Sequence, residues 1–407
     1  MTSYQKIPQL HIQPFGQAHL IQSDVEALEI AHRLAKQFKT DAIQRDAERR
    51  LPVQEIEAYS QSGLWAITVP KQYGGAEVSS YTVAQVIALI SGVDGSIGQI
   101  PQNHFYALEV LRNTGTELQK QKLYAEVLKG ARFGNALAEF KTKNAAQKQT
   151  AITPVDNGFV VNGEKFYCTG SLFAHRIPTL VKNEHGREFL AFIARDSQGL
   201  TLIDDWSGFG QRTTGRGTVK FYHVFVAAEH VIPFDLAFSE PTLVGPFAQI
   251  MHAAIETGIA RAAFEETLLR VRQARPWIDS GLEKATDDPL TLFELGRVIA
   301  DVSASEALLK QAARSIDAAK PNPSIENIAK ASLDVAKVRA HSTETALKAS
   351  SKLIELAGSR GSQGEDGLDR FWRNARVHTL HDASRWKYYF IANYVLNGVL
   401  PPRRGTL

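Results

Sequence analysis

The 407-residue sequence has little cysteine and no long apolar run, and both absences narrow the class of protein. Cys168 is the only cysteine, which excludes a disulfide within the chain and a zinc site built from several cysteines. No apolar run approaches the length of about 20 residues that a membrane-spanning helix needs, and the first residues contain no apolar signal core. We therefore expect a cytoplasmic protein in a reducing compartment, with no membrane partner.

The sequence also lacks a strong charge imbalance. There are 46 Lys and Arg residues against 43 Asp and Glu, and the formal net charge is +3. The basic residues are spread along the chain, so no nucleic acid partner is indicated, whereas small anionic ligands remain compatible. A dinucleotide-binding glycine motif after a strand is missing too. The segment GSRGSQG at 358–364 follows a predicted helix, which is the wrong context for binding a nicotinamide dinucleotide.

What the sequence contains first is a helical pattern over residues 1–132, which predicts an N-terminal helical domain. Ser23 or Asp24 is a plausible N-cap for its first helix. The apolar residues that follow recur at roughly helical spacing: Val25, Leu28, Ile30 and Leu34.

Residues 133–240 have the pattern of a small antiparallel β domain. Asn-Gly pairs stand at 157–158 and 162–163 between β-rich runs, and such pairs are strong hairpin signals. Another hairpin is predicted to turn at His185 and Gly186.

Residues 241–407 return to long Ala- and Leu-rich helices, the longest of which should end near Gly358. Several helices of this kind usually pack as an antiparallel bundle, so we expect a C-terminal four-helix bundle. The predicted fold class is α+β, in the order helical domain, β domain and helical bundle.

Four segments, in order along the chain, resemble the acyl-CoA dehydrogenase superfamily. LWAITVPKQYGG at 64–75 is similar to its N-terminal glycine loop, and GEKFYCTG at 163–170 to its flavin-binding strand. GFGQRTTGRGTVKFYHVFVAAEHVIP at 208–233 resembles the end of its β domain, and ELAGSRGSQG at 355–364 its Gly-rich turn. The resemblance implies an acyl-CoA dehydrogenase-like fold and a flavin cofactor, FMN or FAD.

The same resemblance exposes a departure from the family's usual chemistry. Its dehydrogenases commonly carry their glutamate base in a Tyr-Glu-Gly segment, and here that segment reads His381-Asp382-Ala383. The alternative site for the glutamate aligns near Ala248, with Glu256 two turns away. Since a base must reach its proton at hydrogen-bond distance, the shorter Asp382 is a doubtful substitute. An FAD-dependent acyl-CoA dehydrogenase with Asp382 or Glu256 as base is kept as the alternative function.

Two further segments resemble a different branch, the two-component flavin monooxygenases. RPWIDSGLEKATDDPLT at 275–291 and LDRFWRNARVHTLHD at 368–382 are similar to the SfnB-type sulfur-acquisition oxidoreductases, and the branch includes dibenzothiophene monooxygenase. The resemblance implies reduced FMN supplied by a separate NAD(P)H:flavin reductase, O2 that adds to give a C4a-peroxyflavin, and a small organosulfur substrate. It also implies a homotetramer, a dimer of dimers. A catalytically silent flavin-binding scaffold is the third interpretation.

The resemblance places three residues of the β domain at the flavin. The Thr169 hydroxyl would lie near flavin N5, Asn135 would face the oxygenated flavin or the substrate, and Trp206 would stack on or edge the ring. An amide such as that of Asn135 can both donate and accept hydrogen bonds. The alternatives are a strand threonine, a loop asparagine and a core tryptophan.

Arg275 and Arg360 are the candidates for binding the flavin phosphate, together with the backbone N–H of Gly361 in the Gly-rich turn. In the family such residues often reach the flavin of a neighbouring subunit. A surface salt bridge is the alternative for each arginine.

The segment RNARVHTLHDASRWK at 373–387 carries His378 and His381 one helical turn apart. A metal site is disfavoured because thiolate and His-Glu-x-x-His partners are absent, and a surface helix is the other alternative. The favoured interpretation puts His381 beside the flavin C4a–N5 edge as a proton-handling catalytic residue, with Asp382 orienting one histidine. His104 and Tyr106 are candidates for the substrate pocket, although a lone histidine beside apolar residues is more often structural.

Overall fold

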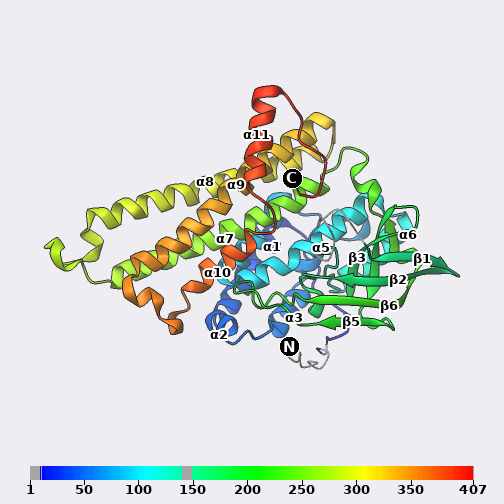
Figure 1. Ribbon diagram of the computed structural model, residues 1–407, viewed down its shortest axis with the longest axis horizontal. Helices are drawn as coiled ribbons and strands as arrows, with labels where there is room; N and C mark the ends of the chain where they lie inside the picture. Colours follow the sequence, from blue (N-terminus) through cyan, green and yellow to red (C-terminus); the bar gives the residue numbers. More distant parts are fainter. Residues whose placement is uncertain (1–9, 11, 140–148, 407) are drawn as a thin grey trace.

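A computed structural model of the chain describes residues 10, 12–139 and 149–406, and it places a sheet at one end of the molecule and long helices at the other (Figure 1). The N-terminal part is helical, as predicted. Its helices are α1 (Asp24–Lys39), α2 (Ala42–Ala47), α3 (Val53–Gln61), α4 (Ser80–Val93), α5 (Gly95–Thr114) and α6 (Glu117–Leu128).

Helix α1 begins as the sequence predicts, because the Ser23 side chain accepts a hydrogen bond from the backbone N–H of Glu26. Val25 lies in the predicted helix, but its side chain is 66% exposed. The buried face of α1 instead uses small residues between the larger ones: Ala27, Ile30, Ala31, Leu34, Ala35 and Phe38. Val25 lies outside this stripe, which the periodicity of large residues alone did not locate.

The central domain is a seven-stranded sheet in the order β5-β6-β2-β1-β3-β4-β7. Its strands are β1 (Ala151–Val155), β2 (Gly158–Lys165), β3 (Arg176–Lys182), β4 (Glu188–Ala194), β5 (Leu200–Ile203), β6 (Thr218–Ala227) and β7 (Val231–Pro233). The sheet is mixed rather than wholly antiparallel, because β1 pairs with β3 in parallel.

Two of the three predicted turns are present in this sheet. Asn157-Gly158 joins β1 to β2, and the turn at His185-Gly186 joins β3 to β4. The pair Asn162-Gly163 is no turn. It lies inside β2, where the register against β6 shifts between Val161 and Gly163 as in a β-bulge.

The C-terminal part contains three long helices, α7 (Val244–Gln273), α8 (Pro289–Ala319) and α9 (Ile325–Leu356), and two shorter ones, α10 (Asp369–His378) and α11 (Arg385–Asn397). Helix α9 ends two residues before Gly358, which has a φ of +67°. Helix α4 packs against α7 and α8, so the bundle draws one of its layers from the N-terminal part. In the parts of the chain that the structure describes, no helix is both long and apolar enough to cross a membrane.

Candidate active site

Three elements deliver polar side chains to one place between the helices and the sheet. Helix α7 carries His252 and Glu256 one turn apart, α10 ends at His378, and His381 follows in the next turn. Helix α5 begins near these residues. Its start is fixed by Asp94, whose side chain accepts hydrogen bonds from the N–H groups of Ser96 and Ile97. We call His252, His378 and His381 the histidine cluster.

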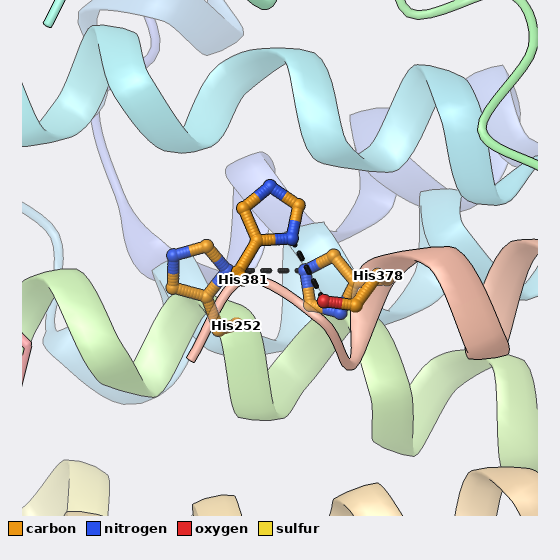
Figure 2. Close-up of side chains that lie close together, drawn as sticks. All are labelled: His252, His378 and His381. Carbon is orange, nitrogen blue, oxygen red and sulfur yellow. Dashed lines mark hydrogen bonds between the residues drawn. The ribbon is translucent and has the colours of Figure 1, made fainter. Parts of the chain in front are cut away.

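The histidine cluster is compact, with ring centroids 5.0 to 5.1 Å apart (Figure 2). His252 Nδ1 lies 3.0 Å from His378 Nε2, and His381 Nδ1 lies 2.7 Å from the backbone oxygen of His378. His252 and His378 are buried, whereas His381 has an exposed surface. The two predicted histidines therefore share a site with a third, His252, that the sequence did not single out.

Glu256 on α7 holds the histidine cluster in place through His378. Its Oε1 is 3.0 Å from His378 Nδ1, and its Oε2 accepts hydrogen bonds from Arg339 and from the hydroxyls of Ser342 and Thr343, both at 2.9 Å. Burial alone would raise the pKa of Glu256, but Arg339 and these hydrogen bonds outweigh it and hold the pKa below its ordinary value. The carboxylate is therefore ionised and fully engaged.

The protonation of the cluster follows from its partners. Burial lowers the pKa of His378 and lowers that of His252 well below the ordinary value, with neighbouring cations acting in the same direction. The pKa of His381 is also well below the ordinary value, because its ring nitrogens are hydrogen-bonded inside the protein and withdrawn from water beside Arg216, although part of the residue is exposed. We therefore take all three rings as neutral at neutral pH. His378 then donates from Nδ1 to Glu256 and accepts at Nε2 from His252.

His381 has a fixed tautomer for the same reason. Its Nδ1–H must donate to the His378 carbonyl, which can only accept. Its Nε2 accepts from Gln99 Nε2 at 2.8 Å and from Arg216 Nη2 at 3.0 Å. His381 therefore lies in the site as an acceptor at Nε2, not as a proton donor there.

Arg216 connects the predicted residues of the two domains. Its Nε donates to Thr169 Oγ1 at 3.0 Å, and its guanidinium lies over the Trp206 ring, 4.6 Å from the centroid. Trp206 in turn meets Tyr167 edge to face at 6.0 Å. Sequence reasoning missed Arg216, Gln99 and Tyr167. The available signal was Arg216 between two glycines, in the loop directly before β6.

Two buried acceptors near this group lack donors. Gln99 Oε1 and Asn135 Oδ1 have no hydrogen-bond partner among the residues that the structure describes. Asn135 is linked to the Thr169 segment through Ser171, whose hydroxyl donates to the Asn135 carbonyl at 2.7 Å. Because a buried acceptor without a donor is costly, both amides fit a ligand that carries N–H or O–H groups.

His104 does not belong to this site. It is fully buried, its Nε2 donates to the Trp65 carbonyl at 2.8 Å, and its Nδ1 accepts from the Phe133 N–H at 3.0 Å. Both ring nitrogens are thus hydrogen-bonded within the protein, which favours the structural alternative for His104. Tyr106 is nearly buried and lies beside Gly405.

The remaining predicted residues lie on other surfaces. Arg275 and Arg360 are exposed and form no ion pair within the described part of the chain, while Gly361 is buried. Asp382 is half-buried and makes no side-chain hydrogen bond in the described ranges. It orients neither histidine, since Glu256 does this for His378 and a carbonyl does it for His381.

His252, which was not considered above when a metal site was disfavoured, brings a third ring nitrogen to the two predicted histidines. One nitrogen from each ring of the histidine cluster lies within 4.8 Å of the others. Other features oppose a divalent cation. Arg216 donates directly to His381, Arg339 lies behind Glu256, and the nitrogens of His378 and His381 are already hydrogen-bonded.

The comparisons with known proteins agree with this architecture. Residues 26–131 match the acyl-CoA dehydrogenase N-terminal domain, and residues 250–386 match the acyl-CoA dehydrogenase C-terminal domain. The chain is 31% identical to dibenzothiophene monooxygenase of Rhodococcus qingshengii, over 96% of this chain and 97% of that protein. The chain belongs to the acyl-CoA dehydrogenase superfamily. Within the superfamily it falls in the branch of flavin-dependent monooxygenases.

Other members of this branch are similar over nearly the full length. The probable FMNH2-dependent monooxygenase SfnC of Pseudomonas putida is 28% identical, over 92% of this chain and 96% of that protein. FMN-bound TdsC from Paenibacillus sp. A11-2 superposes with a TM-score of 0.89 at 30% identity, covering 94% of this chain and all of that one. Methanesulfinate monooxygenase MsuC from Pseudomonas fluorescens gives 0.86 at 27%, covering 93% and 99%.

Proposed function

We propose that this enzyme is a two-component monooxygenase that uses reduced FMN and O2 to oxygenate a small organosulfur compound for sulfur acquisition. A separate NAD(P)H:flavin reductase would supply the reduced FMN. The observation that carries the proposal is one connected group of side chains, in which Arg216 joins Thr169 to His381 beside two buried acceptors without donors. The relatives named for FMN or FMNH2 support FMN over FAD.

The residues present fit a flavin ring. A reduced isoalloxazine carries N–H donors, which the orphaned Gln99 Oε1 and Asn135 Oδ1 need. Thr169 accepts from Arg216, so its own hydrogen is free to donate while a second lone pair can accept. When bound, reduced FMN would supply the electrons that activate O2.

The chain's own residues would then hold the site and control its protons. Glu256 fixes the orientation of His378, and the His378 carbonyl fixes that of His381. The single lone pair of His381 Nε2 already accepts from Gln99 and Arg216, so His381 can take up a proton there only after both donors move away. We therefore propose His381 as a base that is released by ligand binding, with His252 and His378 as its buried support.

The dehydrogenase alternative is disfavoured by the same contacts. Glu256 is fully buried and accepts from four partners, so it has no free geometry for removing a substrate proton. Asp382 lies outside the hydrogen-bonded group of side chains. Neither Glu256 nor Asp382 is therefore in a position that favours removal of a substrate proton.

We further propose a homotetramer in the cytoplasm. Helix α11 projects from the body of the molecule (Figure 1) and exposes large apolar side chains such as Val395 and Leu396, at 78% and 82%. Exposed apolar surface of this kind marks association. In such an assembly the exposed Arg275 and Arg360 would be available to the flavin phosphate of a neighbouring subunit.

An isotope experiment tests the function. Purified enzyme is supplied with FMN, NADH, a flavin reductase and 18O2, and a panel of organosulfur compounds is analysed by mass spectrometry. We expect one 18O atom in the product, and no product when the reductase is omitted unless chemically reduced FMN replaces it. Tightly bound FAD that is bleached by an acyl-CoA would contradict the proposal.

Matched valine variants assign the activity to the site. Thr169→Val should lower product formation at least tenfold, because the hydroxyl beside Arg216 is lost. Thr201→Val, on the exposed side of β5, should leave it unchanged.

A further inference from the structure

Arg216 differs from every other buried arginine that the structure describes. Arg45 pairs with Glu55 and Asp94, Arg132 pairs with Glu57, and Arg339 pairs with Glu256. Arg216 is only 6% exposed, yet it forms no ion pair in the described ranges.

The partners of Arg216 are all uncharged. It donates to a threonine hydroxyl and to a neutral histidine, and its guanidinium covers the face of Trp206. Its third nitrogen, Nη1, has no hydrogen-bond partner within the described residues. Burial lowers the pKa of Arg216 to about 10, so the group still carries its positive charge at neutral pH.

A buried cation without a counterion is costly, and a ligand anion would remove that cost. Guanidinium groups bind oxyanions with two oxygens on one atom especially well, because two of their N–H donors face the same direction. Gln99 and His381, which lie against Arg216, bring no negative charge that would repel such a ligand.

We propose that Arg216 binds the substrate, and that the substrate is a small oxyanion of sulfur, of the sulfinate class, rather than a neutral thiophene. The proposal rests on the monooxygenase function proposed above and narrows its substrate. It agrees with the similarity to a solved methanesulfinate monooxygenase at 27% identity, although dibenzothiophene monooxygenase is more similar in sequence, at 31%.

The overall reaction balances for this substrate. A sulfinate, O2 and reduced FMN give a sulfonate, water and oxidised FMN. One oxygen atom of O2 forms a new S–O bond and the other leaves as water when the O–O bond breaks. The sulfur and the flavin each lose two electrons to O2, and the two hydrogens of the reduced flavin end in the water.

Reduced flavin can itself be an anion, so the experiment separates the two sources of negative charge. Methanesulfinate is titrated calorimetrically into the full-length protein, with and without oxidised FMN, and reduced FMN is titrated under anaerobic conditions. The variants are Arg216→Gln, Arg216→Lys and the control Arg212→Gln, a half-buried arginine on the same loop that donates to backbone oxygens. Unfolding midpoints confirm that each variant is folded.

We expect Arg216→Gln to weaken methanesulfinate binding at least tenfold, Arg216→Lys to retain part of it, and Arg212→Gln to change nothing. Neutral dimethyl sulfone should bind no more weakly to Arg216→Gln than to the wild type.

The proposal would be overturned if the wild type bound no methanesulfinate, either with or without oxidised FMN. It would also be overturned if Arg216→Gln weakened the binding of reduced FMN alone and left methanesulfinate binding unchanged. If a neutral organosulfur compound still incorporates 18O, only the substrate assignment fails. If sulfinate binds through Arg216 but no organosulfur compound is oxygenated, the monooxygenase function fails instead.

Discussion

At the scale of single residues, His104 should make the free energy of unfolding depend on pH in the acid range. Burial lowers the pKa of His104 to about 3, so the folded chain binds no proton there until far below the ordinary value of 6.5. The unfolded chain binds that proton near pH 6.5, and stability is therefore lost as the pH falls from about 6.5 toward 3, by about 1.4 kcal/mol per pH unit.

Replacing His104 by Gln should cost about 2 kcal/mol at pH 7.5, because two buried hydrogen bonds are disturbed. At pH 5 this difference should shrink by about 2 kcal/mol, since the variant has no histidine to protonate on unfolding. Urea unfolding at both pH values measures it. The exposed His32→Gln should show no such change, and an equal difference at both pH values would contradict the assignment.

The buried pair of Glu256 and Arg339 gives a second prediction. Glu256→Gln leaves a fully buried guanidinium without its carboxylate and should destabilise the fold by about 3–5 kcal/mol. Replacing both residues, by Gln and Met, should recover part of this loss. Glu306→Gln is the matched control. Glu306 on α8 pairs with Arg261, which lies on α7 as Glu256 does, and this partly exposed ion pair is worth under about 1 kcal/mol. Chemical denaturation compares them, and equal losses for the two single variants would refute the difference in burial.

The sequence located part of this site and missed the rest for a physical reason. The structure brings Thr169 and His381, which the resemblance assigns to the flavin, into one group of side chains. Their connection runs through Arg216, which is 165 positions from His381. Contacts between residues this far apart depend on how the sheet packs against α10, and no local pattern encodes that. The two hydrogen bonds of His104 were likewise unpredictable, because an isolated histidine carries no sequence sign of its partners.

At the scale of elements, local chemistry was a good guide where one residue type decides the outcome. The N-cap at Ser23 and the hairpins at Asn157 and His185 have the predicted positions. Asn162-Gly163 misled because the same dipeptide suits a bulge within a strand, where Gly163 adopts a φ of +146°. The three long helices were predicted, but the packing of α4 against them is a tertiary contact that periodicity does not show.

Helices α4 and α7 approach each other closely at Gly258, and this contact can be tested. A Cβ at Gly258 would lie 2.2 Å from the backbone oxygen of Ala88, so Gly258→Ala should destabilise the protein by about 3 kcal/mol. The control is Gly296→Ala on α8, where a Cβ meets nothing within 4 Å, and it should stabilise by about 0.5–1 kcal/mol. Thermal unfolding of both variants measures the contrast. A neutral Gly258→Ala would show that the helices can separate at little cost.

At the scale of the whole molecule, the residue patterns along the sequence predicted the order of helical, β and helical parts. The oligomeric state is a proposal that can be tested. If the exposed apolar side of α11 joins subunits, Leu396→Asp should shift the protein from tetramer to smaller species, because a buried charge opposes association. Analytical ultracentrifugation measures this, with Asn397→Asp as the control of equal charge. A monomeric wild type would rule out the proposed assembly.

The single cysteine has a consequence for experiments on this enzyme. Cys168 is fully buried next to Thr169, and burial raises the pKa of its thiol, so reagents that attack thiolates will not modify the folded protein. The rate at which the Cys168 thiol of the native chain is modified therefore reports how often the β domain opens beside the candidate active site. One cysteine introduced at an exposed position would carry a fluorescent or spin label without background, so movements of α10 and α11 could be followed during ligand binding.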